Sequence, residues 1–154
     1  MILRTRLGGL VLVGSVLVGL VVAGCSSAAA PPVVPTPDAS AAAVCDVLMD
    51  ALPATVAGVG RTSNEAFVAQ WGAPPIVLRC GIDKPAALTP DARCDVVNDV
   101  GWFSEQTSKG WRFTTIGRGA FVEVSVPMTY APESRALVDL ADAVALVPEV
   151  KPCV

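Results

Sequence analysis

The residues of this chain with the most definite chemistry are its five cysteines, which are Cys25, Cys45, Cys80, Cys94 and Cys153. An odd number of cysteines in an exported protein leaves one thiol outside the disulfides. The last four would form two disulfides, and three pairings are possible. We expect Cys80–Cys94, which closes a short local loop, and Cys45–Cys153, which joins the two ends of the folded part. No C-x-x-C spacing is present, so disulfides are favoured over a zinc site.

Cys25 follows a segment with the layout of a secretory signal. Arg4 and Arg6 precede 16 uncharged residues, 7–22, and two small residues come directly before the cysteine. The tetrapeptide VAGC at 22–25 resembles the bacterial lipobox, in which the cysteine receives a diacylglycerol and becomes the first residue after cleavage. The resemblance implies a lipoprotein signal peptide over residues 1–24 and a lipid anchor on Cys25. An uncleaved transmembrane helix over residues 7–24 is the alternative.

The rest of the chain divides into a linker and one domain. Residues 25–43 are rich in Ala, Pro, Ser and Thr, a composition that cannot bury a core and predicts a flexible linker. Residues 44–154 are long enough for a single domain. Residues 25–154 exclude Arg4 and Arg6 and so contain 9 basic and 14 acidic residues, which gives a net charge of −5. This balance argues against nucleic acid as a partner, because nucleic-acid binding needs a basic surface.

The sequence gives little support for catalysis or for a bound metal. Histidine is absent from the whole chain, which excludes Ser-His-Asp and Cys-His catalysis and removes the commonest metal ligand. Asp91, Asp95 and Asp99 suggest calcium. However, EF-hand spacing counted from Asp95 places Val97 and Val100 where an oxygen ligand and a glycine are required. We expect no metal, no cofactor and no enzymatic activity.

Apolar periodicity predicts a helix at each end of the domain, over residues 41–52 and 132–147. The expected buried faces are Val44, Leu48, Ala51 and Leu52 in the first helix, and Leu137, Leu140, Ala141 and Val144 in the second. Pro53 ends the first helix. On the exposed face of the second helix, Arg135 and Asp139 have the i,i+4 spacing of an ion pair.

Alternating polar and apolar residues predict antiparallel strands between the helices. One strand covers residues 76–82, and the next places Val96, Val100 and Trp102 on one face. Residues 111–127 predict a hairpin that pairs Phe113 with Val124 and Trp111 with Val126 around a two-residue turn at Arg118-Gly119. We therefore expect an α+β fold of two layers, an antiparallel sheet flanked by an N-terminal and a C-terminal helix.

The best candidate for a binding surface is the polar face of this sheet. Arg79, Arg112 and Glu123 are expected to point outward from it, and Trp102 is added as an aromatic contact. If no helix covers the face, these residues form a binding surface; otherwise they form internal ion pairs. Trp71, Trp102 and Trp111 have the chemistry to stack on sugars, although packing in the core is favoured. Gly117-Arg118-Gly119 is expected to be a hairpin tip rather than an anion-binding nest.

Several separated stretches also carry a family resemblance. The segments WGAPPIVLRCG, VNDVGWF, FTTIGR and VEVSVP resemble the signature stretches of an actinobacterial exported lipoprotein family catalogued as domain of unknown function 3515. The resemblance implies a cell-envelope protein and brings no activity or site residues.

These observations favour a membrane-anchored, non-enzymatic binding or accessory module at the outer face of the cytoplasmic membrane, with an envelope protein as possible partner. A small envelope hydrolase or a cell-wall carbohydrate-binding domain is the alternative.

Overall fold

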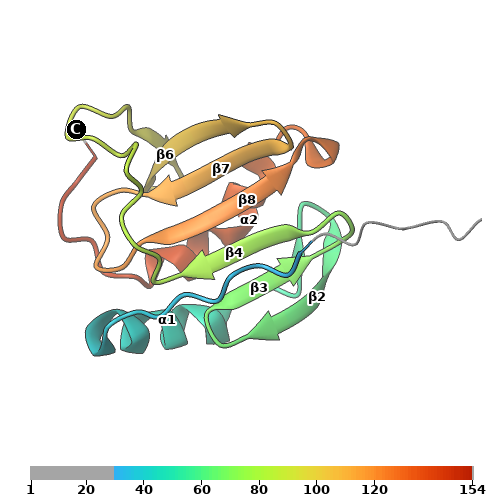
Figure 1. Ribbon diagram of the computed structural model, residues 1–154, viewed down its shortest axis with the longest axis horizontal. Helices are drawn as coiled ribbons and strands as arrows, with labels where there is room; N and C mark the ends of the chain where they lie inside the picture. Colours follow the sequence, from blue (N-terminus) through green and yellow to red (C-terminus); the bar gives the residue numbers. More distant parts are fainter. Residues whose placement is uncertain (1–29, 154) are drawn as a thin grey trace, which may run out of the picture. The chain divides into compact units, whose positions relative to one another are not determined.

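The computed structural model describes residues 30–153, and within this range it forms two α-helices and an eight-stranded antiparallel sheet (Figure 1). The expected signal peptide and Cys25 lie outside the described residues. The helices are α1 (Ala39–Ala51) and α2 (Ser134–Ala145), and a short 3-10 helix, η1 (Met128–Tyr130), precedes α2. This composition confirms the α+β class. None of the helices that the structure describes is long and apolar enough to cross a membrane.

The sheet has the strand order β1-β2-β3-β4-β8-β7-β6-β5. Its strands are β1 (Thr55–Val56), β2 (Val59–Glu65), β3 (Val68–Trp71), β4 (Ile76–Cys80), β5 (Asp95–Val97), β6 (Val100–Thr107), β7 (Gly110–Thr115) and β8 (Val122–Pro127). Strands β1 to β4 form one meander and β5 to β8 form another. The two meanders meet where β4 pairs with β8. Strand β5 is therefore at the opposite edge from β1.

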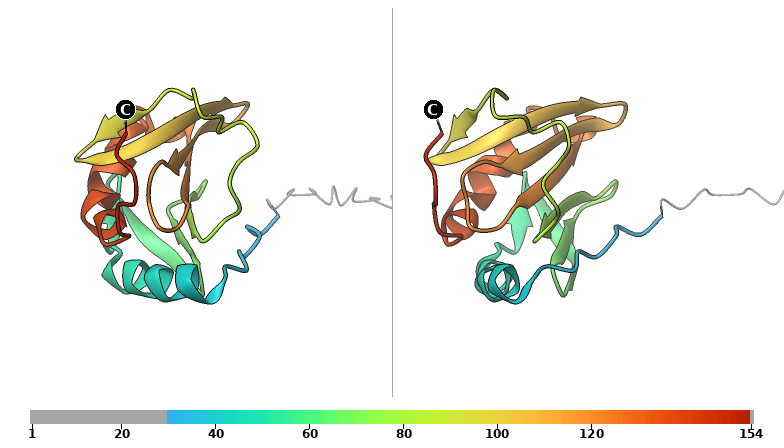
Figure 2. Two further views of the ribbon diagram at one scale, coloured as in Figure 1. Left: turned by 90° about the vertical axis from the view of Figure 1, so that its left-hand side faces the viewer. Right: turned by 60° about the vertical axis from the view of Figure 1, so that its left-hand side comes forward.

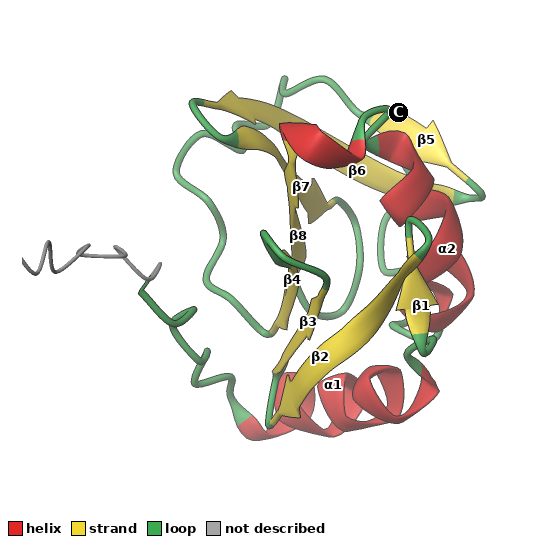
Figure 3. Ribbon diagram, turned by 90° about the vertical axis from the view of Figure 1, so that its right-hand side faces the viewer, coloured by secondary structure: helices red, strands yellow, loops and turns green. Residues whose placement is uncertain are grey.

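The core lies between the helices and one face of the sheet. Alternate residues of β4 and β8, such as Leu78 and Val124, are fully buried there and pack in one cluster with Leu48 of α1 and Leu140 of α2. Burying such side chains contributes about 1.5–3 kcal/mol each. The predicted stripe of α2 is buried throughout, whereas Ala51 of α1 is exposed. Figures 2 and 3 show α2 on one side of the central strands, with the N-terminal segment and the loop of residues 81–94 on the other.

The first helix begins at Ala39, two residues earlier than predicted, because Asp38 caps it. The Asp38 carboxylate accepts hydrogen bonds from the backbone N–H groups of Ser40 and Ala41, both at 2.9 Å, which satisfies donors that have no partner inside the helix. The linker expected over residues 25–43 therefore ends earlier. Residues 31–37 lie against the folded unit, where Val33 accepts a hydrogen bond from Arg79.

The predicted register of the β7–β8 hairpin is confirmed, but its two-residue turn is wrong. Phe113 pairs with Val124 and Trp111 with Val126. The connection, however, spans the six residues 116–121. It is longer because it also holds the C-terminal segment: Gly117 has a φ of +70° and accepts hydrogen bonds from the N–H groups of Val150 and Lys151. A Cβ at Gly117 would come within 1.7 Å of the Lys151 carbonyl oxygen, so only glycine fits there.

Residues 95–102 also differ from the prediction of a single strand. Asn98 and Asp99 both have positive φ, 46° and 62°, and form a two-residue turn between β5 and β6. Asn and Asp tolerate this conformation better than other residues with side chains. The turn separates Val96, which is exposed, from Val100, which is buried.

Both predicted disulfides are wrong. The structure pairs Cys45 with Cys80 and Cys94 with Cys153, with Cα–Cα distances of 5.6 and 6.0 Å. The reason is the strand order. Cys80 ends β4 and faces the core beside α1, whereas Cys94 precedes β5, and strands β8, β7 and β6 lie between β4 and β5. Cysteines so far apart cannot be bridged, despite their short separation along the chain.

Candidate functional site

Three of the four residues expected on the binding surface converge on the polar face of the sheet. Arg79 of β4 is directly opposite Glu123 of β8, and Arg112 of β7 is directly opposite Glu105 of β6. Arg79 donates to Glu123 at 2.8 Å, Arg112 donates to Glu105 at 3.1 Å, and Arg112 Nε lies 3.9 Å from the second oxygen of Glu123. The result is a row of alternating charges across four neighbouring strands, which we call the charge ladder.

The charge ladder is partly shielded from water. The side chain of Glu123 is 8% exposed, and those of Arg79 and Arg112 are 25% and 40% exposed. The hydrogen bond to Glu105 raises the pKa of Arg112 above its already high ordinary value, an effect to which the negative charges of Glu105 and Glu123 add. The four charges of the ladder sum to zero, so its field is local.

The charge ladder forms the floor of a cleft of about 570 Å³. One wall is the N-terminal segment of residues 33–36, and the other is formed by the loop that follows β4, with Ile82, Asp83 and Pro85. Figure 2 shows both segments on the side of the sheet away from α2. None of the described helices covers this face (Figures 2 and 3), and the same residues also form ion pairs within the sheet. The volume lies within the range of sites that hold small ligands or peptide side chains.

Trp102 does not belong to this surface. It is fully buried on the opposite, core-facing side of the sheet, where it pairs with Asp95 and Thr115. Its indole N–H has no hydrogen-bond partner among the residues that the structure describes. Trp71 is equally buried, whereas Trp111 is partly exposed. The packing interpretation is therefore correct for the first two tryptophans.

Glu105 is the residue of the charge ladder that the sequence patterns did not reveal. It lies in the second half of β6, which extends to Thr107 and turns at Ser108-Lys109 into β7. The polar run SEQTSKG hides this strand, because its residues are largely exposed and show no apolar alternation. Glu105 could have been predicted from its spacing to Arg112, because a two-residue hairpin turn at Ser108-Lys109 places the two residues directly opposite each other.

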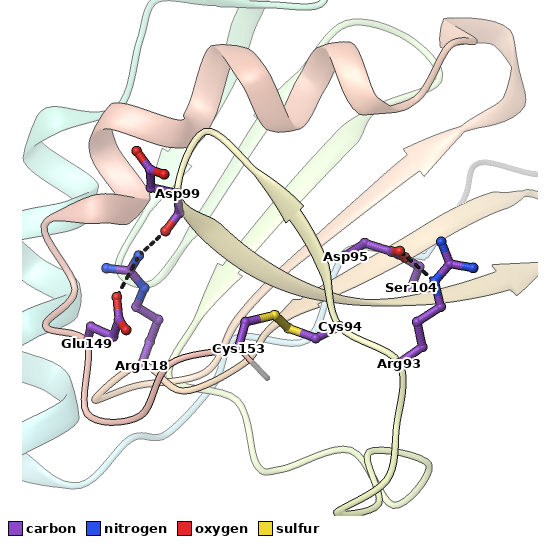
Figure 4. Close-up of a disulfide and its surroundings, with 8 residues drawn as sticks. All are labelled: Arg93, Cys94, Asp95, Asp99, Ser104, Arg118, Glu149 and Cys153. Carbon is purple, nitrogen blue, oxygen red and sulfur yellow. Dashed lines mark hydrogen bonds and ion pairs between the residues drawn. A yellow bond between two sulfur atoms is a disulfide. The ribbon is translucent and has the colours of Figure 1, made fainter.

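Gly117-Arg118-Gly119 lies in the connection of the β7–β8 hairpin, as expected, and Arg118 also clamps this connection to two other segments. The Arg118 side chain is 7% exposed and donates to the carbonyl oxygens of Val147 and Asp99 at 3.0 and 2.9 Å. Figure 4 shows it between Asp99 and Glu149, near the Cys94–Cys153 disulfide. Its charge is thus used to join the end of α2 to the β5–β6 turn.

The acidic residues considered for calcium are separated in the same region. Asp95 accepts hydrogen bonds from Arg93 at 2.7 Å and from Ser104 at 3.0 Å, whereas Asp99 lies in the β5–β6 turn (Figure 4). Over residues 30–153, no group of three or more metal-ligating side chains is found. The expected Arg135–Asp139 pair is also replaced, because Asp139 accepts a hydrogen bond from the backbone N–H of Ala57 at 2.7 Å.

The fold and the cleft define an α+β protein with a charge ladder on the open face of an antiparallel sheet. Comparison with protein-family models then places it more narrowly: the chain belongs to the family described as "Protein of unknown function (DUF3515)", whose model matches residues 7–152. Comparison with curated proteins and with solved structures finds no match.

Proposed function

We propose that this protein is an exported lipoprotein, anchored through Cys25 at the outer face of the cytoplasmic membrane, and that its folded unit binds an extended segment of an envelope protein. The observation that carries the proposal is the cleft above the charge ladder, on the sheet face that the described helices leave open. The proposed activity is binding, without catalysis.

The chain's own N-terminal segment supports an extended polypeptide as the ligand. Residues 31–37, PPVVPTP, run beside β4, and the Val33 carbonyl oxygen accepts a hydrogen bond from Arg79 Nη1 at 3.4 Å. Proline-rich segments are extended in advance and lose little conformational entropy on binding. The cleft thus already holds a main-chain carbonyl against a cation, with apolar walls from Val34 and Ile82.

The carboxylates of the cleft support binding rather than hydrolysis. Glu105 and Glu123 each accept hydrogen bonds from an arginine, Glu105 from Arg112 and Glu123 from Arg79. A glycosidase instead places one carboxyl group to donate a proton and the other to act as nucleophile or base. Because both groups are engaged in ion pairs within the sheet, neither is placed as the acid or the base of such a pair.

The binding proposal is tested by photo-crosslinking in intact cells. A photoreactive amino acid at Ile82, in the wall of the cleft, should form an adduct with a discrete envelope protein. The matched control carries it at Val138, which is 48% exposed on α2. The adduct at Ile82 should disappear in the Arg79→Ala background. Identical adducts at both positions, or none at Ile82 at native expression, would contradict the proposal.

The anchor is tested separately with Cys25→Ala. This change should release the protein from the membrane fraction or block its processing, because the lipid-accepting thiol is lost. A Cys25→Ala protein that stays membrane-bound with unaltered mass would support the uncleaved helix instead. If Cys25→Ala shows that Cys25 is not the anchor, the binding proposal for the cleft is unaffected and is still tested by crosslinking.

A further inference from the structure

A second cavity, of about 520 Å³, lies on the face of the sheet opposite the charge ladder. Its floor is formed by Trp111 and Phe113 of β7, and the segment that enters α2, residues 132–134, forms one wall. Because successive residues of a strand point to opposite faces, Trp111 and Phe113 point away from Arg112 and its cleft. The two cavities are therefore separate sites, and this one does not depend on the function proposed above.

The floor of this second cavity is made of two stacked aromatic side chains, of which Phe113 is 7% exposed and Trp111 is partly exposed. The rings of Trp111 and Phe113 are 6.2 Å apart between centroids and inclined by only 15°. Trp111 keeps part of its surface exposed, in contrast to Trp71 and Trp102, which are fully buried in the core. Aromatic rings that line an open cavity offer a large apolar surface at low cost in side-chain entropy.

The rim opposite the α2 segment is polar and held in place by hydrogen bonds. Asp95 accepts from Arg93 Nε at 2.7 Å and from the Ser104 hydroxyl at 3.0 Å, an arrangement visible in Figure 4. Glu133 lies on the α2 side of the cavity. Asp95 and Glu133 against Arg93 give the lining a net charge of −1, which disfavours anionic ligands.

We propose that this cavity binds a neutral saccharide of two or three units. The apolar face of a pyranose ring would lie against the exposed part of the Trp111 ring, and its hydroxyl groups would meet the carboxylates and the guanidinium of the rim. An aromatic floor with a few fixed polar groups is the usual design of a site for such an amphipathic ligand. The net negative charge selects against phosphorylated or uronic-acid sugars.

Tryptophan fluorescence provides a direct test on the intact folded unit. Since Trp111 is the one partly exposed tryptophan of the three, emission changes on binding report on this cavity. Titration with chitotriose and with maltotriose should give a saturable change for at least one of them, with a Kd of about 1 mM or lower. Trigalacturonate should bind at least about tenfold more weakly. No saturable change with either neutral trisaccharide up to about 20 mM, or tighter binding of trigalacturonate, would overturn the proposal.

Variants assign the binding to the cavity. Asp95→Asn keeps the shape of the side chain and should raise the Kd about tenfold, as measured by calorimetry, whereas Glu65→Gln, at the exposed end of β2, should leave it unchanged. Trp111→Phe keeps an aromatic ring and should abolish the fluorescence change while calorimetric binding persists more weakly. If Asp95→Asn folds, by its circular dichroism, and binds like the parent, the site lies elsewhere and the proposal is wrong.

Discussion

Glu123 is the least exposed charged residue of the cleft, and its loss should weaken the fold. It accepts from Arg79 at 2.8 Å and lies 3.9 Å from Arg112. Removing one partner of a shielded ion pair leaves the other charge without compensation. Because both arginines keep partial access to water, we expect Glu123→Gln to lower the free energy of unfolding by about 1–2 kcal/mol, measured by urea denaturation.

The matched control for this prediction is Glu65→Gln. Glu65 is exposed at the end of β2, and its replacement should change the free energy of unfolding by less than about 0.5 kcal/mol. Equal losses in the two variants would contradict a stabilising role for the charge ladder.

At the residue scale, the sequence patterns correctly predict the charged residues of the polar face but not the side of the sheet on which Trp102 lies. Period-two alternation within single strands correctly placed Arg79, Arg112 and Glu123 on one face. The expectation that Trp102 shares that face is wrong. Trp102 lies on the same side of β6 as Val100, and both are buried. Alternation says which residues share a face, but the choice of the buried face depends on where the helices pack.

The start of α1 depends on Asp38, and this makes part of the stability sensitive to pH. The Ser40 hydroxyl and the backbone N–H groups of Ala41 and Ser40 lower the pKa of Asp38 below its ordinary value of 3.8. A carboxyl group whose pKa is lower in the folded state stabilises the fold above its unfolded pKa, and this contribution is lost as the pH falls through the folded value. We therefore expect Asp38→Ala to lower the Tm more at pH 7 than at pH 2.

Asp38→Asn separates charge from capping in thermal melts at the same two pH values. Asn also caps helices well, so this variant should keep the capping part of the Tm at pH 7 and lose only the part that depends on the negative charge. A drop in Tm for Asp38→Ala that is as large at pH 2 as at pH 7 would show that the carboxylate charge plays no part.

Arg118 holds three elements together, and its loss should be more costly than that of an ordinary surface arginine. Its guanidinium donates to the carbonyls of Val147, after α2, and of Asp99, between β5 and β6. Hydrogen bonds from charged groups contribute about 1.5–3 kcal/mol, and the carbonyls would lose their donor. We expect Arg118→Ala to lower the free energy of unfolding by about 2–3 kcal/mol in urea denaturation.

Arg118→Lys should recover only part of this loss, because a single ammonium group cannot reproduce the planar fork of a guanidinium. Arg135→Ala, exposed on α2, is the control and should be nearly neutral. If Arg118→Ala were as mild as Arg135→Ala, Arg118 would not act as a clamp.

At the element scale, strongly patterned segments are predictable and polar strands are not. The apolar stripe of α2 and the register of β7–β8 follow directly from the sequence, since each has one clearly buried face. Strand β2, VGRTSNE, has no fully buried residue and resembles a loop in composition. It forms because β3 supplies its backbone partners, and this pairing is a long-range effect that local propensity cannot reveal.

At the scale of the whole molecule, the order of the strands in the sheet determines which segments of the chain are neighbours in space. The loop of residues 81–94 leaves β4 in one meander and enters β5 at the far edge of the other. On its way it forms a wall of the cleft, with Ile82 and Pro85. A sequence pattern gives strand positions but not their spatial order. It therefore favours the local Cys80–Cys94 disulfide, which the strand order excludes, and does not reveal that this loop lines the cleft.

The same order assigns a distinct role to each disulfide. Cys45–Cys80 joins α1 to the end of β4, and Cys94–Cys153 joins the C-terminal segment to the start of β5. With sequence separations of 35 and 59, each disulfide should stabilise the fold by about 4 kcal/mol in the chain-entropy model.

Non-reducing peptide mapping should therefore recover a Cys45–Cys80 peptide and a Cys94–Cys153 peptide, and a Cys80–Cys94 peptide would contradict the strand order itself. Gly101 offers an independent check, because a Cβ there would lie 2.9 Å from Cys153 Sγ and 3.0 Å from Cys94 Sγ. These distances are shorter than normal contacts, so Gly101→Ala should lower the yield of the Cys94–Cys153 peptide while leaving the Cys45–Cys80 peptide intact. Equal loss of both peptides would indicate general misfolding rather than a clash at this disulfide.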